Sequence, residues 1–147
     1  MPLKREWIEA HIPHQGRMCL LDEVLHWDAQ RIRCASGGHR ALDHPLRAHG
    51  RLGVICGIEY AAQAMALHGA LIADAAAAKP RGGLLASVRG VRMHVARLDD
   101  VETDLYCDAL RMAGDRVTAV YEFELHASGK RLLSGRATVV LDRPLSP

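Results

Sequence analysis

The chain of 147 residues is long enough for one domain with a hydrophobic core, and its 49% apolar and 24% charged residues are typical of a soluble globular protein. A net charge of +2 gives no reason to expect nucleic acid as a partner. No run is long and uncharged enough to span a membrane, because Glu59 and Asp74 interrupt the most apolar stretch.

The four cysteines include no CxxC pair, so we expect neither a metal site nor a cofactor. They are Cys19, Cys34, Cys56 and Cys107. The first ten residues lack the apolar core of a secretory signal. Together these features predict a cytoplasmic protein whose cysteines are reduced.

Short elements are predicted for the N-terminal part of the chain. Residues 4–11 favour about two turns of helix, which Ile12–Pro13 ends because the residue before a proline disfavours helix. Residues 18–27 and 31–36 have the composition of two strands. Residues 37–53 hold four glycines, one proline and three histidines, and long irregular segments of this kind often carry function.

A long apolar helix is predicted from about residue 54 to 79, and only strands follow it. The helical segment leaves few polar positions, so we expect it to be buried on most faces. Strands are predicted at 84–97, 103–112, 116–126 and 131–141. The sequence therefore predicts a single α+β domain over residues 1–147, with an antiparallel sheet of about five to six strands wrapped around one long central helix.

Two motifs carry a resemblance to a known family. IPHQGRMCLLDEV at 12–24 is similar to IPHRxPFLLVDRV, and HPLRAHGRLGVICGIEYAAQ at 44–63 is similar to HFPGxPxMPGVLxxEAxAQ. Together with the order of elements they resemble hotdog-fold 3-hydroxyacyl-acyl-carrier-protein dehydratases of the FabZ/FabA type, and within these the divergent ApeP-like branch. The resemblance implies a hotdog domain that dehydrates a 3-hydroxyacyl thioester, linked to acyl carrier protein or coenzyme A, in fatty-acid or aryl-polyene lipid synthesis.

The second motif is also where the resemblance implies a site. Elimination of water needs a base beside the thioester carbonyl, an acid for the leaving hydroxide and donors for the enolate-like oxygen. His44 matches the base and Glu59 the acid, while the amides of Gly53 and Val54 at the helix start are the oxyanion donors. His49 in the same loop is the rival base. In the family the histidine and the acid of one site come from different subunits, which implies a homodimer or a heteromer with another hotdog subunit.

Each candidate residue also has a simpler interpretation. A glutamate near a helix start can serve only to satisfy the helix dipole, and Glu59 falls one residue later than the family pattern places its acid. Gln63, four residues on, either orients that carboxyl or bonds neighbouring backbone. We interpret His14 as holding the N-terminal turn and His68 as a buried histidine bonded to backbone. Cys56 has the place of a nucleophile at the helix start, but a small buried apolar residue is the usual case.

Two other functions remain open on the sequence alone. The chain could be a catalytically weak or inactive hotdog subunit that pairs with another, since the residues between His44 and Glu59 depart from the family pattern. It could also be an acyl thioesterase, in which an acidic residue on the central helix activates water without needing His44. Formation of an enoyl product from a 3-hydroxyacyl thioester distinguishes the dehydratase from both alternatives.

Overall fold

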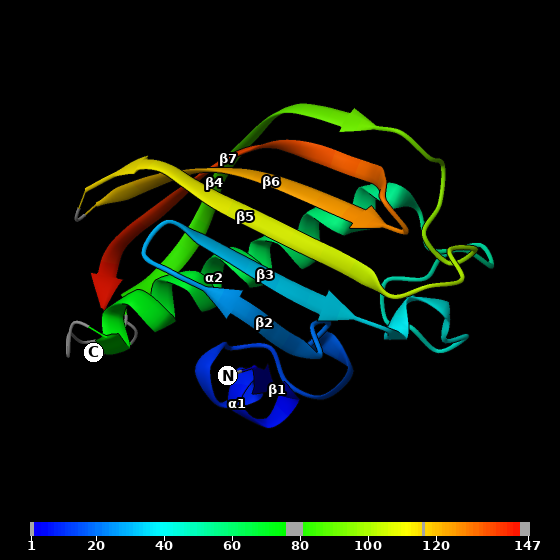
Figure 1. Cartoon of the computed structure of the whole chain (residues 1–147), viewed down its shortest axis with the longest axis horizontal. Helices are drawn as coiled ribbons and strands as arrows, with labels where there is room; N and C mark the ends of the chain where they lie inside the picture. The colour runs from blue at the N-terminus through cyan, green and yellow to red at the C-terminus, as the bar shows by residue number, and fades with distance from the viewer. Residues whose placement is uncertain (1, 76–80, 116, 145–147) are drawn as a thin grey trace.

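A curved antiparallel sheet wraps around one long helix, which confirms the predicted α+β architecture (Figure 1). The computed structural model describes residues 2–75, 81–115 and 117–144. The strand order is β1-β2-β3-β5-β6-β7-β4, and every neighbouring pair is antiparallel. The strands are β1 (Leu3–Lys4), β2 (Glu23–Trp27), β3 (Arg31–Ser36), β4 (Arg81–Met93), β5 (Leu105–Gly114), β6 (Thr118–Ala127) and β7 (Lys130–Pro144).

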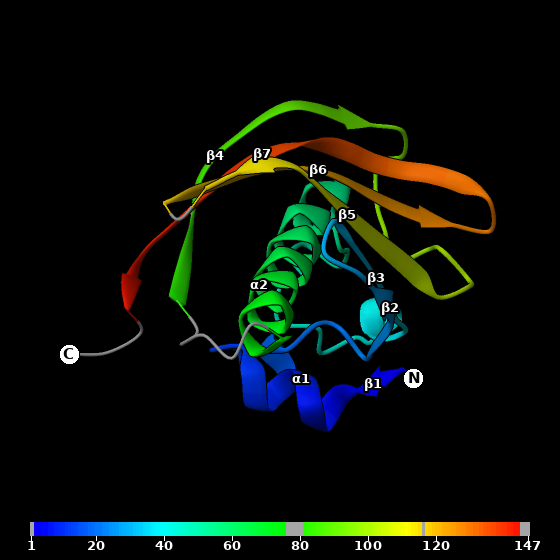
Figure 2. The same cartoon turned by 60° about the vertical axis from the view of Figure 1, so that its left-hand side comes forward.

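The long helix α2 (Gly57–Ala75) lies inside the curve of the sheet. The short helix α1 (Arg5–His11) lies on the side of α2 that faces away from the sheet (Figure 2). A 3-10 turn, Val54–Cys56, leads into α2, and two further 3-10 turns, Gly16–Met18 and Gly38–Arg40, lie in the loops. Residues 54–75 are long and apolar enough to cross a membrane by composition, but the chain itself buries half of that stretch. The stretch is therefore the core helix of this domain.

The start of α2 approaches the sheet closely because Gly57 has no side chain. A Cβ built at this position would lie 2.7 Å from a methyl carbon of Leu133 and 2.9 Å from one of Leu125. Real carbon atoms do not pack at such distances, so only glycine fits here without displacing β6 and β7. Gly57 thereby sets how deep the first turn of α2, which carries Glu59, sits in the sheet.

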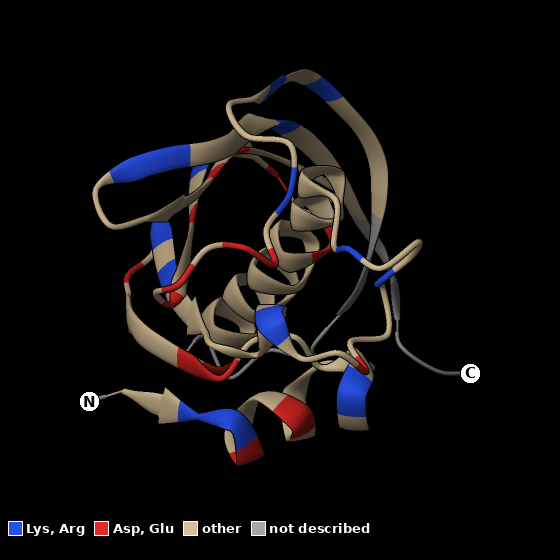
Figure 3. Cartoon of the chain, turned by 90° about the vertical axis from the view of Figure 1, so that its right-hand side faces the viewer, with Lys and Arg blue, Asp and Glu red and all other residues tan. Residues whose placement is uncertain are grey.

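Strand β6 confirms the predicted alternation. Ala119, Tyr121, Phe123 and Leu125 are buried against α2, while Glu122 and the other intervening residues lie on the outer face. Charged residues of both signs are spread over the strands and loops, whereas α2 carries only Glu59 and Asp74 (Figure 3). The inner face of the sheet and the helix therefore form one apolar core.

Over the described residues the sheet has seven strands where about five to six were predicted, because the two-residue strand β1 adds to its edge. Most predicted boundaries differ by one to three residues, and three differ for reasons that the contacts show. The strand predicted at 18–27 begins only at Glu23, because backbone groups of residues 18–20 bond to a side chain of α2 instead of to a strand. The helix predicted from residue 54 starts as a 3-10 turn and becomes α-helical at Gly57, and its predicted end at 79 lies outside the described residues. The strand predicted to reach residue 97 ends at Met93; beyond it the amide of His94 still bonds to the carbonyl of Leu132, and Arg97 forms a bridge to Gly53.

Candidate functional site

Glu59 lies in the first turn of α2 and contacts a histidine from the N-terminal segment. Its carboxylate oxygen Oε1 is 3.3 Å from Nε2 of His14, and the two side chains are 39% and 28% exposed. The helix start carries a partial positive charge, which favours a carboxylate at this position. A carboxylate and an imidazole therefore meet at the edge of the core, and both side chains are partly exposed.

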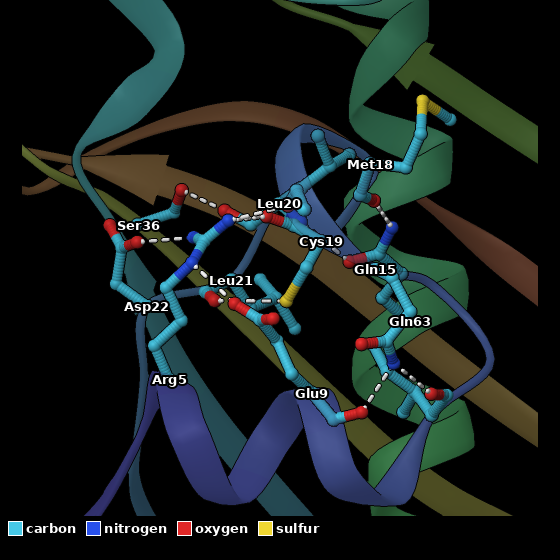
Figure 4. A network of polar contacts seen from close by, with 12 residues as sticks. Arg5, Glu9, Gln15, Met18, Cys19, Leu20, Leu21, Asp22, Ser36 and Gln63 are labelled. Carbon is cyan, nitrogen blue, oxygen red and sulfur yellow. Dashed lines mark hydrogen bonds and ion pairs between the residues drawn. The ribbon is translucent and has the colours of Figure 1, made fainter.

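The segment that carries His14 is fastened to α1. Ile12 caps that helix, with its amide donating to the carbonyl of Ile8 at 3.1 Å. The side-chain amide of Gln15 donates to the carbonyls of Glu9 and Ile12 (Figure 4). Ile12 and Gln15 therefore hold this turn to α1, whereas the ring of His14 makes no hydrogen bond to it among the described residues, so the prediction that His14 holds the turn is wrong. Its contact with Glu59 was not predicted.

Gln63 joins the same segment to α2 one turn after Glu59. Its Nε2 donates to the carbonyl of Met18 at 2.7 Å, and its Oε1 accepts from the amide of Leu20 at 2.9 Å (Figure 4). The side chain is fully buried. Of the two roles predicted for Gln63, the structure therefore places it in the second, the bonding of neighbouring backbone.

His44 is buried and both of its ring nitrogens are engaged within the chain. Nδ1 accepts from the amide of Leu46 at 3.1 Å, so the neutral ring carries its hydrogen on Nε2 and donates to the hydroxyl oxygen of Tyr60 at 2.9 Å. Burial, assisted by the nearby positive charge of Arg47, lowers the pKa of His44. Tyr60 follows Glu59 by about 100° around the helix, so the two turn toward different histidines. The role of His44 as a base for a second subunit stays a prediction.

The rival base, His49, is exposed at the tip of the same loop. It adopts a left-handed backbone conformation with φ of 53°, beside Gly50, where the bridge between Ala48 and Arg51 turns the chain. The side chain of His49 makes no hydrogen bond within the described ranges. Its role also stays a prediction.

A buried carboxylate fastens this loop to the segment that follows β4. Asp99 contacts the guanidinium groups of Arg97 and Arg47, and it accepts from the amide of Leu52 at 2.9 Å. The hydrogen bonds from Arg97 are the main reason that the pKa of Asp99 lies well below its usual range. Asp99 thus holds the residues just before α2 against the segment that follows β4.

The predicted oxyanion donors need a correction. The amide of Val54 donates to the carbonyl of Ala96 at 3.1 Å, so it is already taken by the backbone and does not face a substrate. For the amide of Gly53, the described part of the chain offers no acceptor. Of the two predicted donors, Gly53 alone therefore keeps an amide without an acceptor among the described residues, and its role as an oxyanion donor stays a prediction.

The other candidates contribute no reactive group. Burial raises the pKa of the Cys56 thiol, and its sulfur lies 3.8 Å from the carbonyl oxygen of Leu46, which favours the thiol over a nucleophilic thiolate. His68 is bonded to the carbonyl of Asp28 at 2.8 Å, as its predicted structural role requires. Within the described ranges, no three side chains of His, Cys, Asp or Glu converge as a metal site would need.

The site with Glu59 is open in a single chain. A cavity of about 150 Å³ lies beside His44 and Tyr60, and a groove of about 450 Å³ crosses the outer face of the sheet, but neither includes Glu59 or His14. A binding pocket around Glu59 would therefore need residues from outside this chain to enclose a substrate.

A strongly curved antiparallel sheet around one central helix defines a hotdog-fold protein, and here the first turn of that helix carries a carboxylate in contact with an imidazole. Residues 6–145 match the family model of the ApeP-like dehydratases, described as ApeP dehydratase. The chain belongs to this family, and it is accordingly a dehydratase, a carbon–oxygen lyase.

Solved structures support the fold. The dehydratase heterocomplex ApeI:P from Xenorhabdus doucetiae matches with a TM-score of 0.81 and 23% identity, over 91% of this chain and 90% of that one. A variant thioesterase from Pseudomonas aeruginosa matches with a TM-score of 0.68 and 17% identity, over 97% and 96% of the two chains. A thioesterase from Haemophilus influenzae matches with a TM-score of 0.61 and 14% identity, over 84% and 80%. No curated protein sequence matches this chain.

Proposed function

We propose that this dehydratase removes water from a 3-hydroxyacyl thioester, carried by acyl carrier protein or coenzyme A, to give the trans-2-enoyl thioester in fatty-acid or aryl-polyene-type lipid synthesis. The observation that carries the proposal is the position of Glu59. It is a carboxylate at the start of the core helix, 3.3 Å from an imidazole and still open to a substrate, in a chain of a dehydratase family.

Each chemical step has a candidate group. Glu59 is the acid that protonates the departing hydroxyl, because it is the carboxyl group in the first turn of the core helix and its side chain is partly exposed. An imidazole of the 44–49 loop of a second subunit, His44 or His49, is the base that removes the proton beside the carbonyl. The free amide of Gly53 donates to the thioester oxygen as negative charge develops there.

A second hotdog subunit would complete the site. β4 is the last strand in the sheet, 13 residues long, and it exposes the apolar side chains of Leu85 and Met93. An unpaired edge of this length is a surface on which another strand can add. The segment after β4 bonds to Val54, so a strand that pairs along this edge would end close to the start of α2. The ApeI:P structure is a heterocomplex, which supports a heteromer with another hotdog subunit; a homodimer is the other assembly that we propose.

The carrier would be an acidic protein domain that meets this chain in the cytoplasm. An exposed arginine beside the proposed subunit edge, Arg92 on β4, offers it a cation. Arg97 is less suited to this role, since its guanidinium is paired with Asp99. Charge reversal in Arg92→Glu is expected to weaken binding of acyl carrier protein, and unchanged binding would exclude docking at this edge.

A substrate assay tests the proposal. The purified chain, alone and mixed with a candidate hotdog partner, is given 3-hydroxyacyl carrier protein of several chain lengths, and loss of water is followed by mass spectrometry. Glu59→Gln keeps the size of the side chain but removes the acid, and it is expected to lower kcat by about 100-fold or more. Glu102→Gln is the matched control at an exposed position. Full turnover by Glu59→Gln would refute the role of Glu59.

One observation favours a second candidate function. Both ring nitrogens of His44 are engaged by Leu46 and Tyr60, which suits a subunit that supports a dehydratase and is weakly active by itself. Turnover only in the mixture, with Glu59→Gln of this chain still active there, would favour this alternative. Hydrolysis of a saturated acyl thioester without enoyl product would instead favour the acyl thioesterase.

A further inference from the structure

The contact between His14 and Glu59 links two segments far apart in the sequence. His14 lies in the turn after α1, and Glu59 lies in the first turn of α2, with Nε2 of the ring 3.3 Å from Oε1 of the carboxylate. This is an ion-pair distance, somewhat longer than a tight charge-assisted hydrogen bond. Such contacts are often long in the free enzyme and shorten when the substrate binds.

The surroundings of the ring determine which nitrogen holds the hydrogen. Nδ1 of His14 is buried and has no hydrogen-bond partner among the described residues. A hydrogen on Nδ1 would be a buried donor without an acceptor, which is unfavourable. An unprotonated Nδ1 at the same place costs less free energy. The neutral ring therefore carries its hydrogen on Nε2, the atom that faces Glu59.

The segment that carries the ring is also held in place on both sides. Gln15 bonds the turn to α1, and Gln63 bonds residues 18 and 20 to α2 one turn beyond Glu59. The charged groups of α1 nearby are already paired, since Arg5 bonds to Glu9 and to Asp22. Within the described ranges, Glu59 is the one carboxylate at ion-pair distance from His14.

From these contacts we propose that His14 is the positioning residue of Glu59. Its Nε2–H donates to Oε1 of the carboxyl, so that the other oxygen, Oε2, is the one that holds the acidic proton and faces the substrate. His14 gives up no proton itself. This inference rests on the proposed function in one respect, namely that Glu59 is the acid.

A carboxyl group can rotate about its last bond and present either oxygen. A donor fixed on one oxygen removes that freedom, so the proton to be transferred starts from one defined position. The contribution of His14 should therefore appear in kcat and not in KM, because it acts on the orientation of the acid and not on binding of the thioester.

Nitrogen NMR of the full chain tests the pair without any turnover. The chemical shifts of the ring nitrogens of His14 report the tautomer at neutral pH. We expect the Nε2–H tautomer in the wild type and, in Glu59→Ala, the same tautomer with an Nε2 chemical shift changed by the loss of its hydrogen bond. An Nδ1–H tautomer in the wild type, or no response to Glu59→Ala, would overturn the proposal whether or not the protein dehydrates the substrate offered.

Two variants of His14 then separate the hydrogen bond from packing. Gln reaches the same place with an N–H donor, while Leu has a similar size and no donor. We expect His14→Gln to keep kcat within about threefold of wild type and His14→Leu to lose about 10- to 100-fold at unchanged KM. Equal kcat in the two variants, with both folded by circular dichroism, would overturn the positioning role. If the wild type shows no dehydration, the proposed function fails, while the NMR result still decides the pair.

Discussion

Removal of the Tyr121 hydroxyl should destabilise the fold by about 1–2 kcal/mol. This hydroxyl lies 2.7 Å from Nδ1 of His68, and Nε2 of the same ring lies 2.8 Å from the carbonyl oxygen of Asp28. Since a carbonyl only accepts, Nε2 carries the hydrogen and Nδ1 of the neutral ring accepts from the hydroxyl. His68 is fully buried, so Tyr121→Phe leaves Nδ1 without a partner, and an unsatisfied buried acceptor costs about 1–3 kcal/mol.

Urea unfolding at neutral pH measures this loss, and Tyr106→Phe is the matched control. The Tyr106 ring stacks on His126, and its hydroxyl makes no hydrogen bond within the described ranges. We expect Tyr121→Phe to lower the melting temperature by roughly 2–8 °C, from about 2–4 °C per kcal/mol for a domain of this size. Tyr106→Phe should stay within about 0.5 kcal/mol of wild type. Equal stability of the two variants would refute the reasoning.

The same contact predicts a dependence of stability on pH. Burial lowers the pKa of His68 in the folded state, whereas the unfolded chain takes up a proton at about pH 6.5. The stability that the neutral ring contributes is therefore complete above about pH 6.5 and is lost progressively as the pH falls below it. His68→Gln cannot titrate, so it should flatten this decline, while His26→Gln at an exposed position should not. An unchanged decline in His68→Gln would show that His68 does not cause it.

Four further substitutions follow from the packing and the polar contacts. Gly57→Ala should destabilise the fold by about 1–3 kcal/mol, because the new Cβ would clash with two leucines. Gly69→Ala should stabilise it by about 0.5–1 kcal/mol, because its Cβ would have no atom within 4 Å. Thermal unfolding of both variants checks this. Gln63→Leu should speed hydrogen exchange at the amide of Leu20, which would lose its acceptor, and an unchanged rate would contradict that bond. Asp99→Asn should remove part of the loss of stability below about pH 4, since the lowered pKa of this carboxyl stabilises the fold above that pH and the contribution disappears as it is protonated.

The elements whose residues repeat with a regular period could be predicted, and those held by single side chains could not. The alternation in β6 follows from the period of two, and the apolar composition of α2 follows from its burial. The start of β2 depends instead on Gln63, a side chain more than forty positions away that takes the backbone bonds of Met18 and Leu20. No local pattern contains that information.

The site divides in the same way. Glu59 and its place at the helix start could be predicted because acid and helix are neighbours in one motif. The contact of His14 with Glu59 needed the fold, since it joins two motifs 45 residues apart, although each motif was recognisable by itself. The engagement of Val54 by Ala96 was hidden for the same reason, because a helix start looks free until the strand beside it is placed.

The extra residue before Glu59 now has a structural account. Glu59 and Gln63 keep the spacing of four that the family motif has, so both retain their direction on α2 and both face the segment of residues 14–20. The additional residue therefore lies ahead of Glu59, where Val54–Cys56 form a 3-10 turn that takes three residues per turn instead of 3.6. The extra residue is accommodated in the segment that precedes the helix, and the same segment includes the loop with His44. In this chain Glu59 lies against His14, whereas the ring of the loop histidine His44 is turned to Tyr60.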